Sequence, residues 1–260
     1  MHIQICRFAY PLLLLALQPA LAADLLIKET LTTTARDKVV HATRAIAIKG
    51  ERMRIEVEQD GEPSVTLFDV PEGVTIALDA SKRHASVTAM SARAAELEQK
   101  VPRARVTTTV TAAGTTREIA GVRCENHAFT VRVPATTDGD QIVVLSGTAC
   151  VAPSAPGAAD YSTFARAAAA RDLVVGYASS NKFFLAVTRG RTELYRELAK
   201  VPGIPYVIEM TSKAEGMGVF NRMLNKIVAA RSVSTVTTVT TTPIEDARFR
   251  VPDGWKRQQK

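Results

Sequence analysis

The chain has 260 residues, 46% of them hydrophobic and 23% charged, with a formal net charge of +7. Its basic residues alternate with acidic ones, as in the run from Glu51 to Glu56, instead of forming the dense patches with which proteins bind nucleic acid. The charge pattern therefore excludes nucleic acid as an expected partner, and the length suits one large all-β domain or two small ones.

The first 22 residues have the order of a secretory signal peptide. Arg7 and the amino terminus form a short positive region, Phe8 to Leu17 is an apolar run, and Ala20 to Ala22 is a small-x-small cleavage site. The apolar run is too short for a bilayer span, which needs roughly 20 residues. We expect cleavage after Ala22 and release into the bacterial periplasm as a soluble protein with no integral membrane segment.

Short strands separated by turn signals are predicted from Leu26 to Met90. Pairs such as Lys49-Gly50 and Asp60-Gly61 recur about every 8–12 residues, with no helical period between them. This spacing indicates an antiparallel meander. Its predicted strands are Leu26–Thr34, Val39–Ile48, Arg52–Glu58, Ser64–Val70, Val74–Leu78 and His84–Met90.

The segment from Arg52 to Glu58 alternates most clearly between apolar and charged residues. Met53, Ile55 and Val57 share one face, and charged side chains occupy the other. Because successive side chains of a strand point to opposite faces, we expect the apolar three on a core and the charged face in water.

The middle of the chain predicts one short helix followed by strands. The helix runs from Ser91 to Lys100, with Ser91 as its N-cap and Pro102 beyond its end. Asp138-Gly139-Asp140 predicts the turn of a hairpin formed by the last two strands. The strands predicted here are Ala104–Thr111, Thr115–Ile119, Gly121–Val133 and Gln141–Val151.

A helical insert at about 158–200 separates these strands from the last ones. Tyr161 to Ala170 is Ala-rich and predicts a helix capped by Asp160, and Thr192 to Lys200 predicts a second short helix. The rest is predicted as a strand at Ile204–Lys213, a helix or mobile segment at Gly218–Ala229, a strand at Ser232–Thr241 and a solvated basic tail at Lys256–Lys260.

Two cysteines, Cys124 and Cys150, remain after cleavage of the signal peptide. An oxidising compartment favours a disulfide between them, and closing a loop of about 25 residues contributes about 3 kcal/mol in the chain-entropy model. The alternatives are a metal site that includes His127, which is one ligand short of the usual four, and two free thiols.

The usual signatures of catalysis are missing from the chain. It contains no Gly-x-Ser-x-Gly elbow, no phosphate-binding glycine loop and no His-Glu-x-x-His. His41, His84 and His127 each lie outside any recognisable motif. We therefore expect a protein that is not an enzyme, with no catalytic residue, no metal and no cofactor.

The helical insert carries half of the aromatic residues of the mature chain. A half-closed sheet covered by apolar helices would enclose a pocket suited to an acyl chain or an apolar segment. The alternative is that these side chains complete the core. They are Tyr161, Phe164, Leu173, Val174, Val175, Tyr177, Phe183, Phe184, Leu185, Leu194 and Tyr195.

Four segments, in order along almost the whole mature chain, resemble a bacterial envelope family known as the domain of unknown function DUF4412. They are Ile48–Glu56, Ile119–Cys124, Gly203–Met210 and Phe249–Lys256. The resemblance implies a sheet related to the lipoprotein-carrier (LolA/LolB-like) fold, a curved antiparallel half-barrel with helices over its concave side. The resemblance implies no catalytic residues. In its cysteine pair and its helical insert, this chain differs from true lipoprotein carriers.

We therefore expect residues 23–260 to form one mainly β, LolA-like domain. Its expected function is to bind an apolar ligand, either a lipid or an acylated protein, in the half-barrel. The alternative is a protein-interaction or structural module of the envelope, with another envelope protein as its partner and no small-molecule ligand. The sequence identifies no ligand-binding residue.

Overall fold

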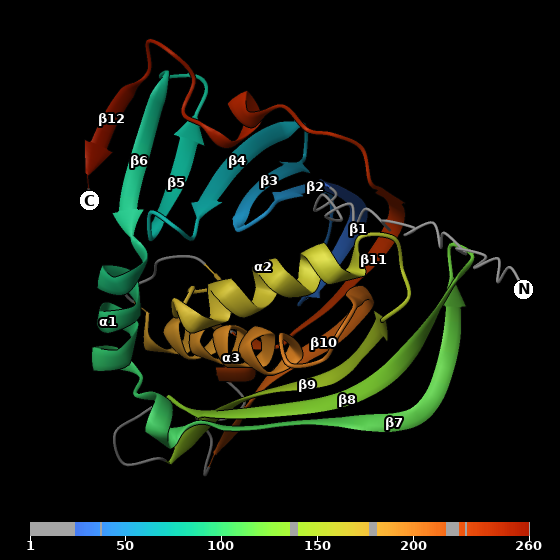
Figure 1. Ribbon diagram of the computed structural model, residues 1–260. Helices are drawn as coiled ribbons and strands as arrows, with labels where there is room; N and C mark the ends of the chain where they lie inside the picture. The colour runs from blue at the N-terminus through green and yellow to red at the C-terminus, as the bar shows by residue number, and fades with distance from the viewer. Residues whose placement is uncertain are drawn as a thin grey trace, which may run out of the picture.

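One open, curved sheet dominates the computed structural model, which describes residues 24–36, 38–135, 140–176, 181–216, 224–226 and 228–259. The predicted signal peptide, residues 1–22, lies outside the described residues. Within them, twelve strands form the sheet in the order β12-β6-β5-β4-β3-β2-β1-β11-β10-β9-β8-β7 (Figure 1). The strands are β1 Leu25–Ala35, β2 Lys38–Lys49, β3 Arg52–Gln59, β4 Glu62–Asp69, β5 Val74–Asp79, β6 His84–Ala89, β7 Thr107–Ile119, β8 Val122–Pro134, β9 Gln141–Ala152, β10 Ile204–Gly216, β11 Ala230–Thr240 and β12 Lys256–Gln259.

Neighbouring strands pair antiparallel throughout the sheet except for the parallel pair of β12 and β6. The first six strands form the predicted meander. Asp60 and Gly61 both have positive φ, at 54° and 79°, in the turn between β3 and β4. Two such residues suit a two-residue hairpin turn whose twist matches that of the strands.

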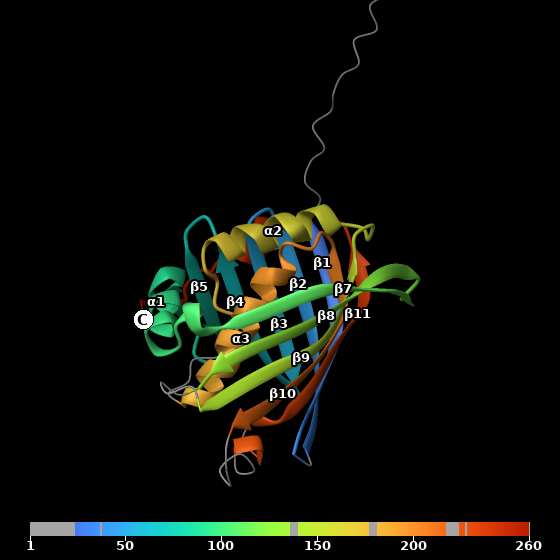
Figure 2. The same cartoon turned by 90° about the horizontal axis from the view of Figure 1, so that it is seen from below.

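The helices lie on the concave side of the sheet, as expected. They are α1 Met90–Lys100, α2 Ala158–Ala170 and α3 Lys182–Leu198. The sheet curves around α2 and α3, which run across its hollow, while α1 lies at one rim (Figures 1 and 2). The predicted curved antiparallel sheet with helices over its concave face is confirmed.

Strand register shows which side chains face the helices. Leu25 and Ile27 of β1 and Ile48 of β2 are buried with Phe164 of α2, so they point to the concave, or inner, face. Ile48 pairs with Met53 of β3, and cross-strand partners share a face. Every second residue from these positions therefore lies on the inner face of β1 to β4.

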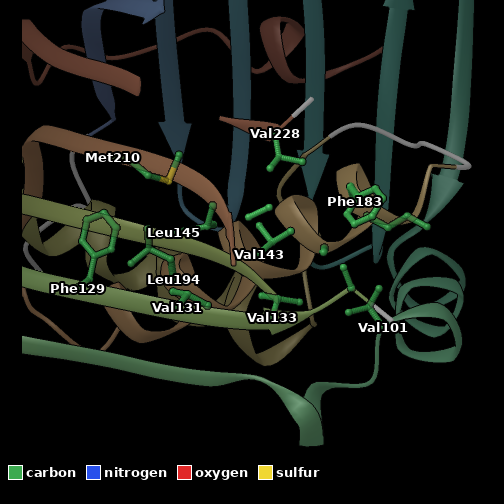
Figure 3. Packing of buried hydrophobic residues seen from close by; sticks show 14 of the residues in the cluster. Val101, Phe129, Val131, Val133, Val143, Leu145, Phe183, Leu194, Met210 and Val228 are labelled. Carbon is green, nitrogen blue, oxygen red and sulfur yellow. The ribbon is translucent and has the colours of Figure 1, made fainter. Parts of the chain in front are cut away.

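Two buried clusters form the core beneath the helices. In the first, α3 packs on β8 and β9, with Phe183 and Leu194 against Val131, Val133 and Leu145 (Figure 3). In the second, Phe164 and Ala168 of α2 pack against the start of β1 and the end of β2. A fully buried disulfide in this second cluster joins Cys124 of β8 to Cys150 of β9, with a Cα–Cα distance of 5.3 Å. The pairing favoured by the sequence is therefore present.

Among the predicted elements, the helices differ most from the structure in where they begin. Helix α3 begins at Lys182, ten residues before the predicted Thr192, because the Asn181 side chain accepts hydrogen bonds from the backbone N–H of Phe183 and Phe184. The predicted caps of the other helices were also wrong. Ala89 precedes α1 directly after β6, and Gly157 with its left-handed φ of 73° precedes α2.

Two predictions about the strands and the tail also need correction. Residues 104–111 and 115–119 are not separate strands: β7 runs through both, with a register irregularity between Ala112 and Thr116, and Arg103–Arg105 form a 3-10 turn before it. The basic tail forms β12, which pairs its backbone with β6 although its side chains are exposed. Residues 224–226 and 228 are helical, whereas Asp138, Gly139 and most of the segment from Gly218 to Ala229 lie outside the described residues.

Candidate functional site

The helices cover the inner face unevenly. Helix α3 packs on β7, β8 and β9, whereas α2 reaches the sheet at β2 and β10 and α1 at β6. In Figure 1, α3 lies close to β8–β10, and α2 lies between α3 and the half of the sheet that contains β3 and β4. The inner face of β3 and β4 is therefore the part of the sheet in which apolar side chains can remain accessible.

Four apolar side chains on this part of the sheet stay partly exposed, and we call them the open inner face: Met53, Ile55, Val57 and Phe68. The alternation in β3 correctly predicted which residues share a face. Met53 packs against the second core cluster, as expected, but the expectation that the charged face would lie in water was wrong, since Arg52, Arg54 and Glu56 are half-buried. Apolar side chains at such a concave, incompletely covered surface are typical of ligand-binding sites.

The charged face of β3 is half-buried because the C-terminal segment crosses it. Arg54 donates through Nη1 to the backbone oxygen of Arg248, at 3.1 Å, and Arg248 pairs with Glu56 at 2.8 Å. Burial alone would raise the pKa of Glu56, but the hydrogen bonds from Arg54 and Arg248 lower it overall. The outer face of β3 is thus occupied by the chain's own C-terminal segment, unlike the inner face.

A buried polar cluster lies on the inner face next to these apolar residues. Arg44 of β2 pairs with Glu29 of β1, and Ser234 of β11 donates to Glu29 at 2.7 Å. Burial opposes the charge of Arg44, yet Glu29 outweighs it and raises the pKa of the guanidinium. Burial and then the nearby Tyr195 raise the pKa of Tyr161 on α2, so its phenol stays neutral. The cluster therefore places polar groups on a part of the inner face that is otherwise apolar.

A cleft of about 660 Å³ opens at the far end of β1 and β2, and we call it the basic cleft. It lies between the tip of the β1–β2 hairpin, the first turn of α3 and the segment before β11. Ligand pockets commonly have volumes of about 300–1,000 Å³. The lining residues are Thr33, Ala35, Arg36, Lys38, Val40, Phe184, Lys226 and Ala229.

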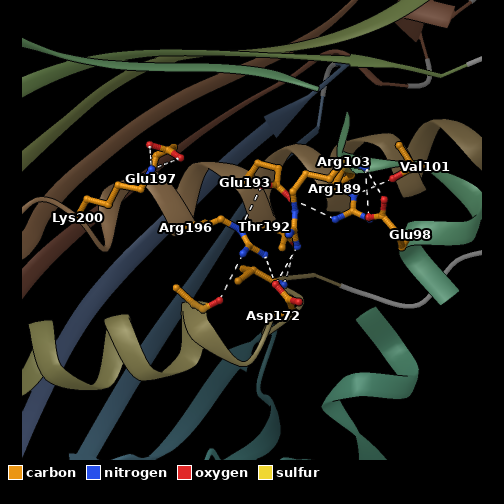
Figure 4. Close-up of polar contacts among 12 residues, drawn as sticks. Glu98, Val101, Arg103, Asp172, Arg189, Thr192, Glu193, Arg196, Glu197 and Lys200 are labelled. Carbon is orange, nitrogen blue, oxygen red and sulfur yellow. Dashed lines mark hydrogen bonds and ion pairs between the residues drawn. The ribbon is translucent and has the colours of Figure 1, made fainter. Parts of the chain in front are cut away.

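Helices α1 and α3 are joined by alternating arginines and carboxylates, which we call the arginine network (Figure 4): Glu98, Arg103, Asp172, Arg189, Glu193 and Arg196. Arg189 is 2% exposed and bonds the backbone oxygen of Val101 at 2.8 Å, Glu98 at 2.8 Å and Glu193 at 3.1 Å. Three positive and three negative side chains balance, so the network has no surplus charge for a ligand. We assign it to holding the helices over the sheet.

Acid should weaken the arginine network at Asp172. Burial alone would raise the pKa of this carboxyl, but hydrogen bonds from Arg196 and Arg103 lower it overall. A lowered pKa stabilises the fold above the ordinary value of about 3.9, and this stabilisation is lost as the pH falls through the lowered value. We expect the stability difference between wild type and Asp172→Asn in urea unfolding to shrink as the pH falls below about 4. A difference that stays constant or grows, while the exposed-turn control Asp253→Asn is unaffected, would contradict this assignment.

The aromatic and apolar residues predicted in the helical insert serve mostly in the core. Phe164, Val174, Phe183, Leu185 and Leu194 are buried there. Tyr161 and Leu173 are partly exposed but pack against the second core cluster. Val175 and Tyr195 are partly exposed, Phe184 is 47% exposed, and Tyr177 lies outside the described residues. The core alternative therefore accounts for most of the set, and Phe184 is the member that lines the basic cleft.

The remaining candidate residues do not assemble into a site. His41 contacts Thr32 at 3.2 Å, while His84 and His127 lie on β6 and β8. Among the described residues, no three His, Cys, Asp or Glu side chains are grouped as metal ligands. Within the same residues, no helix has the length and apolar character needed to cross a bilayer.

Comparisons with known proteins give distant structural likenesses. No protein-family model and no curated protein matches the chain. An uncharacterised conserved protein from Thermus thermophilus aligns with a TM-score of 0.41 and 8% identity over 92% of both chains. A putative outer membrane lipoprotein-sorting protein domain from Vibrio parahaemolyticus aligns at 0.35 and 6% over 87% of this chain and 89% of that chain. A LolA superfamily protein from Nitrosomonas europaea aligns at 0.32 and 9% over 88% and 90%.

The fold and the site together define a half-barrel protein with helices seated in its concavity and an incompletely covered inner face. The structural likenesses all have TM-scores below 0.5 and identities of 10% or less. The proposals below therefore rest on the geometry of this chain. The resemblance to DUF4412 stays a prediction, since no family model matches.

Proposed function

We propose that residues 23–260 form a single periplasmic domain that binds an apolar ligand, a lipid or an acylated partner, on the inner face of its half-barrel. The observation that carries this proposal is the open inner face, where Met53, Ile55, Val57 and Phe68 stay partly exposed on the part of the sheet that the helices cover least. Membership of the DUF4412 family is part of the same proposal.

The energetic argument concerns the apolar area that these side chains leave in contact with water. Covering apolar surface contributes about 25 cal/mol per Å², so a chain of methylene groups lying along four such residues gains free energy without directional contacts. The neighbouring cluster of Arg44, Glu29 and Ser234 supplies polar atoms that can orient the polar end of such a ligand. An apolar surface with a few placed polar groups is the usual composition of a small-molecule site.

Two features support a non-catalytic role in the periplasm. The disulfide between Cys124 and Cys150 suits an oxidising compartment, in agreement with the predicted signal peptide. The carboxylates with lowered pKa, such as Glu56 and Asp172, are engaged by arginines in ion pairs. Such ion pairs favour a structural role for these carboxylates over a role in proton transfer.

The proposal is tested with a matched pair of Val→Asp variants on adjacent strands. Val57 of β3 lies on the inner face, and Val65 of β4, which pairs with Glu56, lies on the outer face. Both are partly exposed, so the two substitutions alter the sheet to a similar degree. We expect Val57→Asp to weaken the binding of a fluorescent fatty acid at least about tenfold, because a charged, hydrated carboxylate opposite Arg44 replaces an apolar contact of the acyl chain, whereas Val65→Asp leaves binding unchanged.

Thermal unfolding of both variants checks that the fold is kept. Mass spectrometry of an organic extract of protein purified from the envelope provides a second readout, with a bound lipid as the expected result. A wild-type protein that takes up no fluorescent fatty acid and carries no extractable lipid would contradict the proposal. That result would favour the alternative of a protein-interaction module of the envelope.

A further inference from the structure

The basic cleft gathers three cations from segments far apart in the sequence. Arg36 and Lys38 lie at the β1–β2 connection, and Lys226 comes from the helical residues before β11. Arg36 donates from Nε to the backbone oxygen of Lys226, which ties the two segments together. Among the described residues, none of the three cations forms an ion pair, and Asp37 between the first two lies outside the described residues.

Apolar side chains line the same cleft beside these cations. Phe184, in the first turn of α3, lines the cleft and is 47% exposed. Thr33, Ala35 and Val40 lie on the inner face of β1 and β2, in the same rows of side chains as Arg44 and Ile46. These lining residues therefore lie on the same face of the sheet as the open inner face.

We propose that the basic cleft binds the head of an amphiphile whose acyl chain ends in an anionic group, a carboxylate or a phosphate. This inference rests on the proposed function and adds the ligand class and the location of its polar end. Arg36, Lys38 and Lys226 surround the anionic group. Phe184 and Val40 contact the first methylene groups, and the chain runs toward the inner face of β3.

Charge complementarity selects an anionic head group over a neutral one. Like charges around one cleft repel each other, and an anion removes that repulsion while gaining charge-assisted hydrogen bonds. An uncharged lipid would add no counter-charge to the three cations, none of which forms an ion pair with another described residue. Because the cations are exposed, their contribution falls as salt is added.

The test compares three competitors that share a 16-carbon chain: hexadecanoate, hexadecyl phosphate and hexadecanol. Each displaces an uncharged fluorescent apolar probe from the wild-type protein below its micelle concentration at low salt. We expect both anions to bind roughly tenfold more tightly than the alcohol, the sum expected for two or three exposed charge contacts. The stronger of the two anions identifies a carboxylate or a phosphate as the natural head group.

Two matched double variants test whether the cations of the basic cleft cause the preference for anions. The double variant Lys38→Gln, Lys226→Gln removes two charges from the cleft and keeps the hydrogen bond that Arg36 donates to the backbone of residue 226. It should abolish the preference for anions without weakening the binding of hexadecanol. Lys256→Gln with Arg257→Gln removes two exposed charges from β12 and should leave the preference intact. Equal binding of all three competitors, or an equal effect of both double variants, would overturn this inference and leave the proposed function standing. Failure of all three competitors to bind would contradict both.

Discussion

Replacing Arg189 with methionine is expected to destabilise the protein by about 3–5 kcal/mol, the cost of breaking a buried ion pair by removing one partner. Arg189 is 2% exposed, and its guanidinium bonds Glu98, Glu193 and the backbone oxygen of Val101 at the end of α1. Methionine fills similar space but leaves buried Glu193 without this partner. Equilibrium urea unfolding at pH 7 measures the loss.

Two further variants separate this effect from ordinary surface electrostatics. Lys200 pairs with Glu197 at the end of α3 while 67% exposed, so Lys200→Ala should cost no more than about 1 kcal/mol. Removing Glu193 together with Arg189 should cost less than the sum of the single changes, because the contact between these two buried side chains is lost only once. If Arg189→Met costs no more than Lys200→Ala, the arginine network does not hold the helices in place.

The substitution Gly147→Ala is expected to cost about 4 kcal/mol, above the 1–3 kcal/mol usual for overpacking. Gly147 of β9 faces Met210 of β10, and a Cβ at this position would overlap the backbone oxygen of Glu209 and lie 2.9 Å from its carbonyl carbon. Backbone atoms in a paired strand cannot rotate away as the end of a side chain can. Relief would require β9 and β10 to move apart within the sheet.

Gly50→Ala is the matched control for Gly147→Ala. A Cβ on Gly50 meets nothing within 4 Å, so its cost is limited to the left-handed φ of 57°, about 1 kcal/mol. Thermal unfolding of the two variants side by side gives the comparison. Equal losses at the two positions would show that the approach of β9 to β10 is looser than the structure indicates.

The meander of β1 to β6 was predictable because its signals are local. Alternating side chains and turn pairs such as Asp60-Gly61 specify each hairpin within about 20 residues, and the structure has the strands within a few residues of their predicted bounds. The start of α3 was missed because Val187, Thr188 and Gly190 lower helix propensity, and the cap signal of Asn181 was overlooked. Strand β12 has no apolar pattern, so only backbone pairing with β6 reveals it.

The candidate site was predictable only in part. Alternation in β3 placed Met53, Ile55 and Val57 on one face, but which half of the sheet the helices cover depends on packing between segments distant in sequence. The basic cleft was missed for the same reason. Arg36 and Lys226 are 190 residues apart, and charge patterning along the chain cannot bring them together.

The central claim, that an apolar ligand occupies the inner face, is tested most directly by photo-cross-linking. An acyl chain carrying a diazirine is bound to the wild-type protein and irradiated, and the adducts are mapped by peptide mass spectrometry. We expect saturable adducts on the inner face of β3 and β4, at or next to Ile55, Val57 and Phe68, that unlabelled hexadecanoate suppresses. Adducts confined to the outer face, or adducts that do not saturate, would contradict the account.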